Sequence, residues 1–224
     1  MTTYANLPGF TWVTSQVGGL LPPDWREQLV ETAMKDSKFK VLTASSVTSR
    51  EEHPDVEIPS YTVDGRALRE AAPWLTDLYH STFRDLAAQF CGQLVDTARN
   101  ELYGAVLNMQ RGPMTYECHV DSNPVQGLLY VTTHAPGDGG ELVVGRQSDA
   151  HSTAAVEADC EVIYPVAGHL HFFDGRRWPH YVRPLREASA VRVVVAMNFY
   201  TEDSPESARP ADLDEHLFGA META

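Results

Sequence analysis

Cysteine is scarce in this sequence. The 224 residues include three cysteines, Cys91, Cys118 and Cys160, which are widely spaced and form no C-x-x-C pair. An odd number of scattered cysteines predicts neither a disulfide framework nor a zinc ribbon. A reducing compartment, the cytoplasm, is therefore the expected location.

Long apolar runs and clusters of basic residues are also missing. The apolar runs are too short to span a bilayer, and the stretch Met1 to Phe10 lacks the basic segment and apolar core of a signal peptide. Lys and Arg number 17 against 31 Asp and Glu, which gives a formal net charge of -14. The short apolar runs make a membrane an unexpected partner. Because a surface of this charge repels a phosphate backbone, nucleic acid is not expected as a partner either.

The composition is that of a folded domain. Hydrophobic residues make up 43% of the chain and charged residues 21%, so a sizeable core can form. The length suits one domain over residues 1–224. We expect a helical N-terminal part over 1–100, a β-rich core over 101–200 and a tail over 201–224.

Two helices and a loop are predicted in the N-terminal part. Pro22 to Asp36 and Pro73 to Ala98 carry apolar residues at intervals of three or four, which is typical of amphipathic helices. Between them, Val47 to Asp64 is rich in charge, Pro and Ser, and predicts a surface loop that borders a pocket. A short helix is expected in the tail at Leu213–Phe218.

After Asn100 the pattern changes to short β-branched and aromatic runs separated by turn residues. Eight strands at this spacing predict a jelly roll or barrel. The expected strands are Tyr103–Met109, Tyr116–Asp121, Leu128–Thr133, Glu141–Val144, Val162–Val166, His169–Phe173, Tyr181–Arg183 and Val191–Tyr200.

One of these strands contains a His-x-Asp pair. Side chains alternate along a strand, so His119 and Asp121 point to the same face. His180 lies far enough along the chain for further strands to return it to the same place. Two His and one carboxylate on one face of a metal leave three coordination positions open, as non-haem Fe(II) oxygenases require. On its own, the pair is more typical of the polar face of a surface strand.

Several further segments, in this order and spacing, resemble the Fe(II)/2-oxoglutarate dioxygenase superfamily in its prolyl-4-hydroxylase-like branch. The resemblance extends from about Asn108 to Tyr200, and the first hundred residues carry none of its motifs. The matching segments are Gly139-Gly-Glu-Leu142, Tyr164-Pro-Val-Ala-Gly168, His169-Leu-His-Phe-Phe173, Pro179-His-Tyr-Val-Arg-Pro-Leu185 and Arg192-Val-Val-Val-Ala-Met-Asn-Phe199.

This resemblance implies a mainly β protein with a double-stranded β-helix, a jelly-roll core of the cupin-like kind. It implies Fe(II), 2-oxoglutarate and molecular oxygen as reactants, with His119, Asp121 and His180 as the metal ligands. Arg192 matches the residue that pairs with the distal carboxylate of 2-oxoglutarate, and a guanidinium can grip a carboxylate with two hydrogen bonds. Arg183 and Arg186 are alternative anchors.

The sequence departs from the family pattern before the first ligand. Gln110 and Pro113 stand where the family usually has Tyr and Gly. Asn108 and Gln110 are candidates for hydrogen bonds to the co-substrate or substrate, and they serve equally well to satisfy a neighbouring backbone.

A second histidine pair gives an alternative metal site. His169 and His171 form the H-x-H motif that opens the metal site of cupins, but Asp174 is the only nearby acid where a cupin places glutamate. More often such strand histidines are hydrogen-bonded core residues or line a pocket.

The function implied is hydroxylation of an unactivated C–H bond in an amino acid or another small metabolite. A peptidyl or protein prolyl hydroxylase is the closest rival, and a non-oxygenase, cupin-like binding module is the alternative from another class. The substrate side of the pocket is expected among the Val47–Asp64 loop, acting as a lid, and a few side chains. These are Arg176, Arg177, Arg183, Tyr116 and Trp178.

Overall fold

The computed structural model describes residues 2–7, 10–42, 51–53 and 58–218. Two antiparallel sheets dominate it. The large sheet has the strand order β1 (Thr2–Leu7), β2 (Phe10–Gln16), β11 (His169–Phe173), β8 (Val125–Tyr130), β13 (Val191–Thr201), β6 (Ala105–Arg111), β4 (Ile58–Val63) and β3 (Lys38–Leu42), and β5 (Val95–Thr97) also pairs with β13. The small sheet has the order β10 (Cys160–Ile163), β9 (Leu142–Gly145), β12 (His180–Val182) and β7 (Tyr116–His119).

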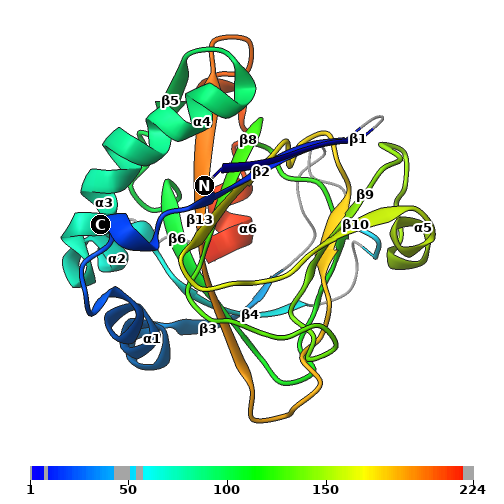
Figure 1. Ribbon diagram of the computed structural model, residues 1–224, viewed down its shortest axis with the longest axis horizontal. Helices are drawn as coiled ribbons and strands as arrows, with labels where there is room; N and C mark the ends of the chain where they lie inside the picture. The colour runs from blue at the N-terminus through cyan, green and yellow to red at the C-terminus, as the bar shows by residue number, and fades with distance from the viewer. Residues whose placement is uncertain (1, 8–9, 43–50, 54–57, 219–224) are drawn as a thin grey trace.

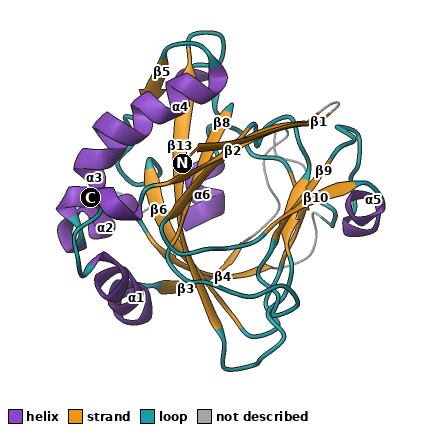
Figure 2. Cartoon of the chain, in the orientation of Figure 1, coloured by secondary structure: helices purple, strands orange, loops and turns teal. Residues whose placement is uncertain are grey.

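Helices cover one side of the large sheet, and the small sheet lies on the other. Figure 1 shows α1, α2, α3 and α4 on the first side and β9, β10 and α5 on the second. The same division into helical and strand layers is plain in Figure 2. The helices are α1 (Trp25–Asp36), α2 (Gly65–Ala71), α3 (Pro73–Leu78), a π-helical turn (Tyr79–Phe83), α4 (Arg84–Cys91), α5 (Thr153–Ala158), α6 (Leu213–Phe218) and two 3-10 turns (Gly18–Leu20, Glu206–Ala208).

The alternation of side chains along β13 divides the interior into two parts. Val193, Val195, Met197 and Phe199 join the core beneath the helices. Between them, Arg192, Val194, Ala196 and Asn198 face a cavity enclosed by the two sheets. One strand thus contributes an apolar face to the core and a partly polar face to the cavity.

Each of the eight strands predicted after Asn100 has a counterpart, with ends that differ by a few residues, and the tail helix is present as α6 at Leu213–Phe218. None of the helices in the described part of the chain is long and apolar enough to cross a membrane.

The prediction of a helical N-terminal part was incomplete, because this part also supplies β1, β2, β3 and β4 to the large sheet. β4 occupies Ile58–Val63, inside the segment predicted to be a surface loop. Its inward residues Ser60 and Thr62 are polar yet buried, since they line the cavity, and this removes the apolar alternation by which strands are detected. Positions 47–50 and 54–57 of the predicted lid lie outside the described residues.

The predicted helix from Pro73 to Ala98 was too long. It ends at Cys91 because Gly92 adopts a left-handed conformation with φ of 71° and its N–H caps the carbonyl of Ala88. Leu94, which continued the apolar period, is 87% exposed, and Val95–Thr97 forms a strand. A period of apolar residues does not reveal where a glycine ends the helix.

Candidate metal and co-substrate site

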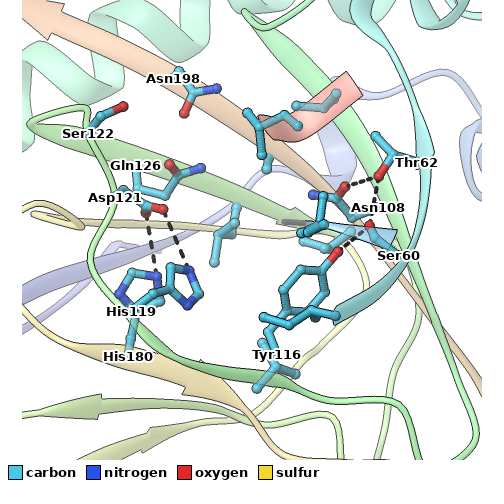
Figure 3. A pocket seen from close by; sticks show the side chains of 18 of the residues that line it. Ser60, Thr62, Asn108, Tyr116, His119, Asp121, Ser122, Gln126, His180 and Asn198 are labelled. Carbon is cyan, nitrogen blue, oxygen red and sulfur yellow. Dashed lines mark hydrogen bonds and ion pairs between the residues drawn. The ribbon is translucent and has the colours of Figure 1, made fainter. Parts of the chain in front are cut away.

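The three predicted metal ligands lie together at one end of the cavity. His119 ends β7 and is paired directly with His180, which begins β12. Asp121 follows two residues after His119, and its backbone N–H donates to the carbonyl of Gly175 at 2.9 Å. The Asp121 carboxylate oxygens lie 3.8 Å from His119 Nε2 and 3.5 Å from His180 Nε2 (Figure 3).

Backbone carbonyls turn both imidazole rings toward the carboxylate. His119 Nδ1 donates to the carbonyl of Glu117 at 2.8 Å, and His180 Nδ1 donates to the carbonyl of Trp178 at 2.9 Å. Because a carbonyl can only accept, each ring carries its proton on Nδ1. The lone pair of each Nε2 therefore faces Asp121, which is the arrangement in which histidine binds a metal.

Burial favours the neutral form of the second histidine. His180 is 5% exposed, and desolvation lowers its pKa to about 4, although the Asp121 carboxylate acts in the opposite direction. A neutral imidazole is the ligand form. Ligand atoms of the three residues all lie within 4.8 Å of one another, so a divalent cation fits between them.

A glycine makes room for the carboxylate. A Cβ atom at Gly175 would lie 2.3 Å from Asp121 Oδ2, well inside van der Waals contact. Gly175 belongs to the turn between β11 and β12, so the same turn that delivers His180 also accommodates Asp121. No motif or spacing in the sequence distinguishes this glycine from the others.

Arg192 is a buried cation in the wall of the same cavity. It is 4% exposed, and among the described residues no carboxylate pairs with it and no acceptor binds its Nε. Its guanidinium lies 5.6 Å from the ring centre of Tyr130, and its charge acts to lower the pKa of the Tyr130 hydroxyl against the larger effect of burial. Desolvation lowers the pKa of Arg192. Such a site is suited to an anion supplied from outside the protein.

The cavity has a volume of about 200 Å³ and contains both the histidine–carboxylate cluster and Arg192. Figure 3 shows polar side chains on the wall away from the cluster. Thr62 Oγ1 donates to Asn108 Oδ1 at 3.1 Å, and Ser60 Oγ lies 2.5 Å from the Tyr116 hydroxyl. Asn108 and Tyr116 are both in the cavity wall, where Asn108 can take the first of its two predicted roles.

Other predicted residues lie elsewhere. The Gln110 amide donates to the carbonyls of Met114 and Arg183, and Gln110 is not part of the cavity wall. Of its two predicted roles, the structure favours the satisfaction of neighbouring backbone.

Three basic residues that the sequence offered for the pocket are engaged outside it. Arg183 binds Glu157 through Nε at 2.8 Å and Nη2 at 2.7 Å. Arg176 donates to Ser204, and Arg177 stacks over the ring of Trp178. None of them is among the described residues that line the cavity. Arg186, in the turn after Leu185, does not line it either.

The C-terminal helix forms a wall of the cavity, which the sequence did not indicate. Leu213, His216, Leu217 and Phe218 of α6 line it. His216 Nε2 lies 3.4 Å from Glu51 Oε1, and Glu51 in turn forms a β-bridge with His119. The contact between Glu51 and His216 joins distant parts of the chain, and no local pattern in the sequence records it.

No family model and no curated protein matches the sequence. Solved structures do. A 2OG-Fe(II) oxygenase family oxidoreductase from Burkholderia pseudomallei aligns with a TM-score of 0.59 and 14% identity over 91% of this chain and 90% of its own. The fold of this chain is that of a 2OG-Fe(II) oxygenase.

Two further structures with the same TM-score agree with this fold. AviO1 from Streptomyces viridochromogenes Tue57 has 17% identity over 89% of this chain and 92% of its own, with a TM-score of 0.59. A Trichoplax adhaerens prolyl hydroxylase, solved with a hypoxia inducible factor peptide, has 15% identity over 89% and 87%, again with a TM-score of 0.59. The resemblance read from the sequence is thus confirmed at the level of the 2OG-Fe(II) oxygenase fold.

Proposed function

We propose that the chain is an oxygenase that depends on Fe(II) and 2-oxoglutarate, built as a single domain around a double-stranded β-helix. Support comes from the fold together with the cluster of His119, Asp121 and His180 at one end of the cavity. In this proposal the three side chains hold the iron. Iron with 2-oxoglutarate and oxygen supplies the oxidising power to functionalise an unactivated C–H bond.

The observation that carries the proposal is the buried charge of Arg192. Arg192 is 4% exposed and has no acid partner among the described residues. Burial of its charge destabilises the fold through lost hydration, unless a ligand supplies a negative charge. Arg192 would bind the distal carboxylate of 2-oxoglutarate, and Asn108 and Tyr116 lie in the same cavity. An anion anchor and a three-ligand metal cluster in one cavity match the two requirements of this co-substrate.

The neutral histidines contribute by orientation. Each is held by a carbonyl behind it, so neither ring has to rotate when the metal binds. Asp121 adds a negative charge, which stabilises a divalent cation bound between the three side chains. With His119, Asp121 and His180 as its protein ligands, a bound Fe(II) would have positions left for reactants.

For the substrate we propose an amino acid or another small metabolite, which would be hydroxylated. The cavity wall beside Asp121 carries the polar side chains of Ser122, Gln126 and Asn198, which can orient a polar molecule (Figure 3). On another side α6 and Glu51 form part of the cavity wall, and a volume of about 200 Å³ suits a small molecule better than the extended peptide that a prolyl hydroxylase must admit.

The cupin-like alternative has less support. His171 lines a different cavity from the histidine–carboxylate cluster, and no acidic residue is among the described neighbours that line this second cavity. A metal bound by His169 and His171 would lack a carboxylate ligand.

Iron-dependent conversion of 2-oxoglutarate to succinate tests the proposal. Purified protein is incubated with Fe(II), 2-oxoglutarate, ascorbate and a panel of free amino acids and small metabolites, and succinate is measured. The expected result is iron-dependent succinate that at least one compound stimulates and that Asp121→Ala abolishes. Succinate formation that is equal in Asp121→Ala and wild type would contradict it.

A further inference from the structure

A second cavity is lined by residues of β2, β8, β10 and β11. Its volume is about 260 Å³, and no residue in its wall also lines the first cavity. β2 contributes Trp12 and Thr14, β11 contributes His171, and β10 contributes Ile163. The 2-oxoglutarate proposal does not use this space.

Two buried nitrogen atoms in its wall have no partner in the described part of the chain. These are His171 Nε2 and Trp12 Nε1. His171 is 0% exposed, its Nδ1 lies 2.7 Å from Thr14 Oγ1, and its ring lies 5.0 Å from that of Trp12. Buried polar groups are nearly always hydrogen-bonded, so two such atoms beside one cavity indicate that something polar occupies it.

The chemistry of the wall restricts that occupant. Among the described residues that line the cavity there is no Lys, Arg, Asp or Glu. Desolvation lowers the pKa of His171 to about 3, so its ring is neutral near pH 7. A charged ligand would have no counter-ion here and would lose its hydration.

The wall also favours a flat occupant. Trp12, Tyr130 and His171 contribute rings, Ile163 contributes an apolar side chain, and Tyr164, which is 42% exposed, leads to solvent. Aromatic walls favour ring stacking. The indole N–H of Trp12 can only donate, so it requires an acceptor oxygen or nitrogen on the ligand.

We propose that this second cavity binds an uncharged aromatic molecule that carries a hydroxyl or carbonyl group. Trp12 Nε1 donates a hydrogen bond to the oxygen of that group, and His171 Nε2 forms a second hydrogen bond with the same group. Phenol is the simplest molecule of this class. Toluene lacks the oxygen, and benzoate adds a charge, so these two are the matched negative probes.

The test follows the indole N–H signals of the four tryptophans in an ¹H–¹⁵N spectrum, recorded without iron or 2-oxoglutarate. The signal of Trp12 is assigned with Trp12→Phe. Trp74 is an internal control, because its Nε1 already donates to Gln28 Oε1 at 2.8 Å. As the phenol concentration rises, the chemical shift of the Trp12 signal is expected to change and then level off, while that of Trp74 stays constant. Neither toluene nor benzoate should produce such a saturating change.

Variants distinguish a specific phenol site from nonspecific binding of phenol to the protein. His171→Leu is expected to weaken phenol binding at least tenfold, and Thr14→Val, which leaves His171 in place but frees its Nδ1, should weaken it less. If His171→Leu does not fold, Thr14→Val provides the comparison. The proposal would be overturned if phenol left the Trp12 signal unchanged, or if toluene shifted it equally. Water would then be the occupant of the cavity. Because iron and 2-oxoglutarate are absent, the outcome is independent of the oxygenase proposal.

Discussion

His119 and His180 are direct partners across two adjacent antiparallel strands, with their ring centres 4.4 Å apart. The main-chain ladder between β7 and β12 fixes their separation, and the carbonyls of Glu117 and Trp178 fix their rotation. The imidazole part of the proposed iron site is therefore preformed, as precise metal sites require.

Gly175→Ala should weaken metal binding without unfolding the protein. The new Cβ would lie 2.3 Å from Asp121 Oδ2 and would force the carboxylate away from the two imidazoles. Loss of geometry at one ligand predicts at least a tenfold weaker Fe(II) affinity, roughly the effect of removing a supporting contact. The affinity is measured anaerobically by calorimetric titration.

Gly19→Ala is the matched control, because a Cβ atom there meets nothing within 4 Å. Its Fe(II) affinity should equal that of wild type. Equal affinities in Gly175→Ala and wild type would show that Asp121 is not a ligand in its present position.

Arg192→Met should abolish 2-oxoglutarate binding yet leave the protein without co-substrate at least as stable. The guanidinium is buried and has no acid partner among the described residues, so its removal relieves a desolvation cost. In wild type, 2-oxoglutarate at 100 times its Kd adds about 2.7 kcal/mol to the free energy of unfolding, and the variant should gain nothing. Urea unfolding with and without 2-oxoglutarate checks both points. A large loss of stability without the co-substrate would mean that Arg192 has a structural partner.

The sequence predicted the strands of the core because β-branched and aromatic runs, such as that of β13, leave a local mark. It predicted the candidate ligands from the His-x-Asp spacing at the end of β7 and from the family resemblance of the segment around His180. It did not reveal β4, because a strand whose inner face lines a polar cavity lacks a regular apolar pattern. Nor did it reveal the pairing of Glu51 with His216 or of Arg192 with Tyr130. Such contacts join residues that only the fold brings together, and a single sequence records no trace of them.

Glu51 and His216 should be energetically coupled. Their side chains are 7% and 8% exposed and lie 3.4 Å apart, and the pair connects α6 to the segment that bridges β7. In a double-mutant cycle with Glu51→Gln and His216→Gln, we expect a coupling free energy of about 1 kcal/mol, measured by thermal or urea unfolding. Additivity within about 0.4 kcal/mol would mean that the contact does not hold α6 in place.

Arg183→Met should change the pH dependence of stability but not the affinity for 2-oxoglutarate. Hydrogen bonds from Arg183 lower the pKa of Glu157, so this pair stabilises the fold above the unfolded pKa of Glu157 and loses that effect as the pH falls through the lowered value. Because both groups are about a third exposed, the effect should be about 0.5 kcal/mol.

Unfolding measured between pH 7 and pH 3 should give a flatter profile for Arg183→Met than for wild type. The same variant serves as the control for Arg192→Met. A large loss of 2-oxoglutarate affinity in Arg183→Met would transfer the role of anchor to Arg183.

The most direct test of the iron and co-substrate site is an anaerobic titration with Fe(II) and 2-oxoglutarate, followed by the weak visible charge-transfer band of chelated 2-oxoglutarate. It compares wild type, His180→Ala and His151→Ala, whose histidine is exposed and is not among the residues that line the cavity. The band should appear in wild type and His151→Ala and be absent in His180→Ala. A band of equal strength in His180→Ala, or no band in any of the three proteins, would contradict the assignment of His119, Asp121 and His180 as the iron site.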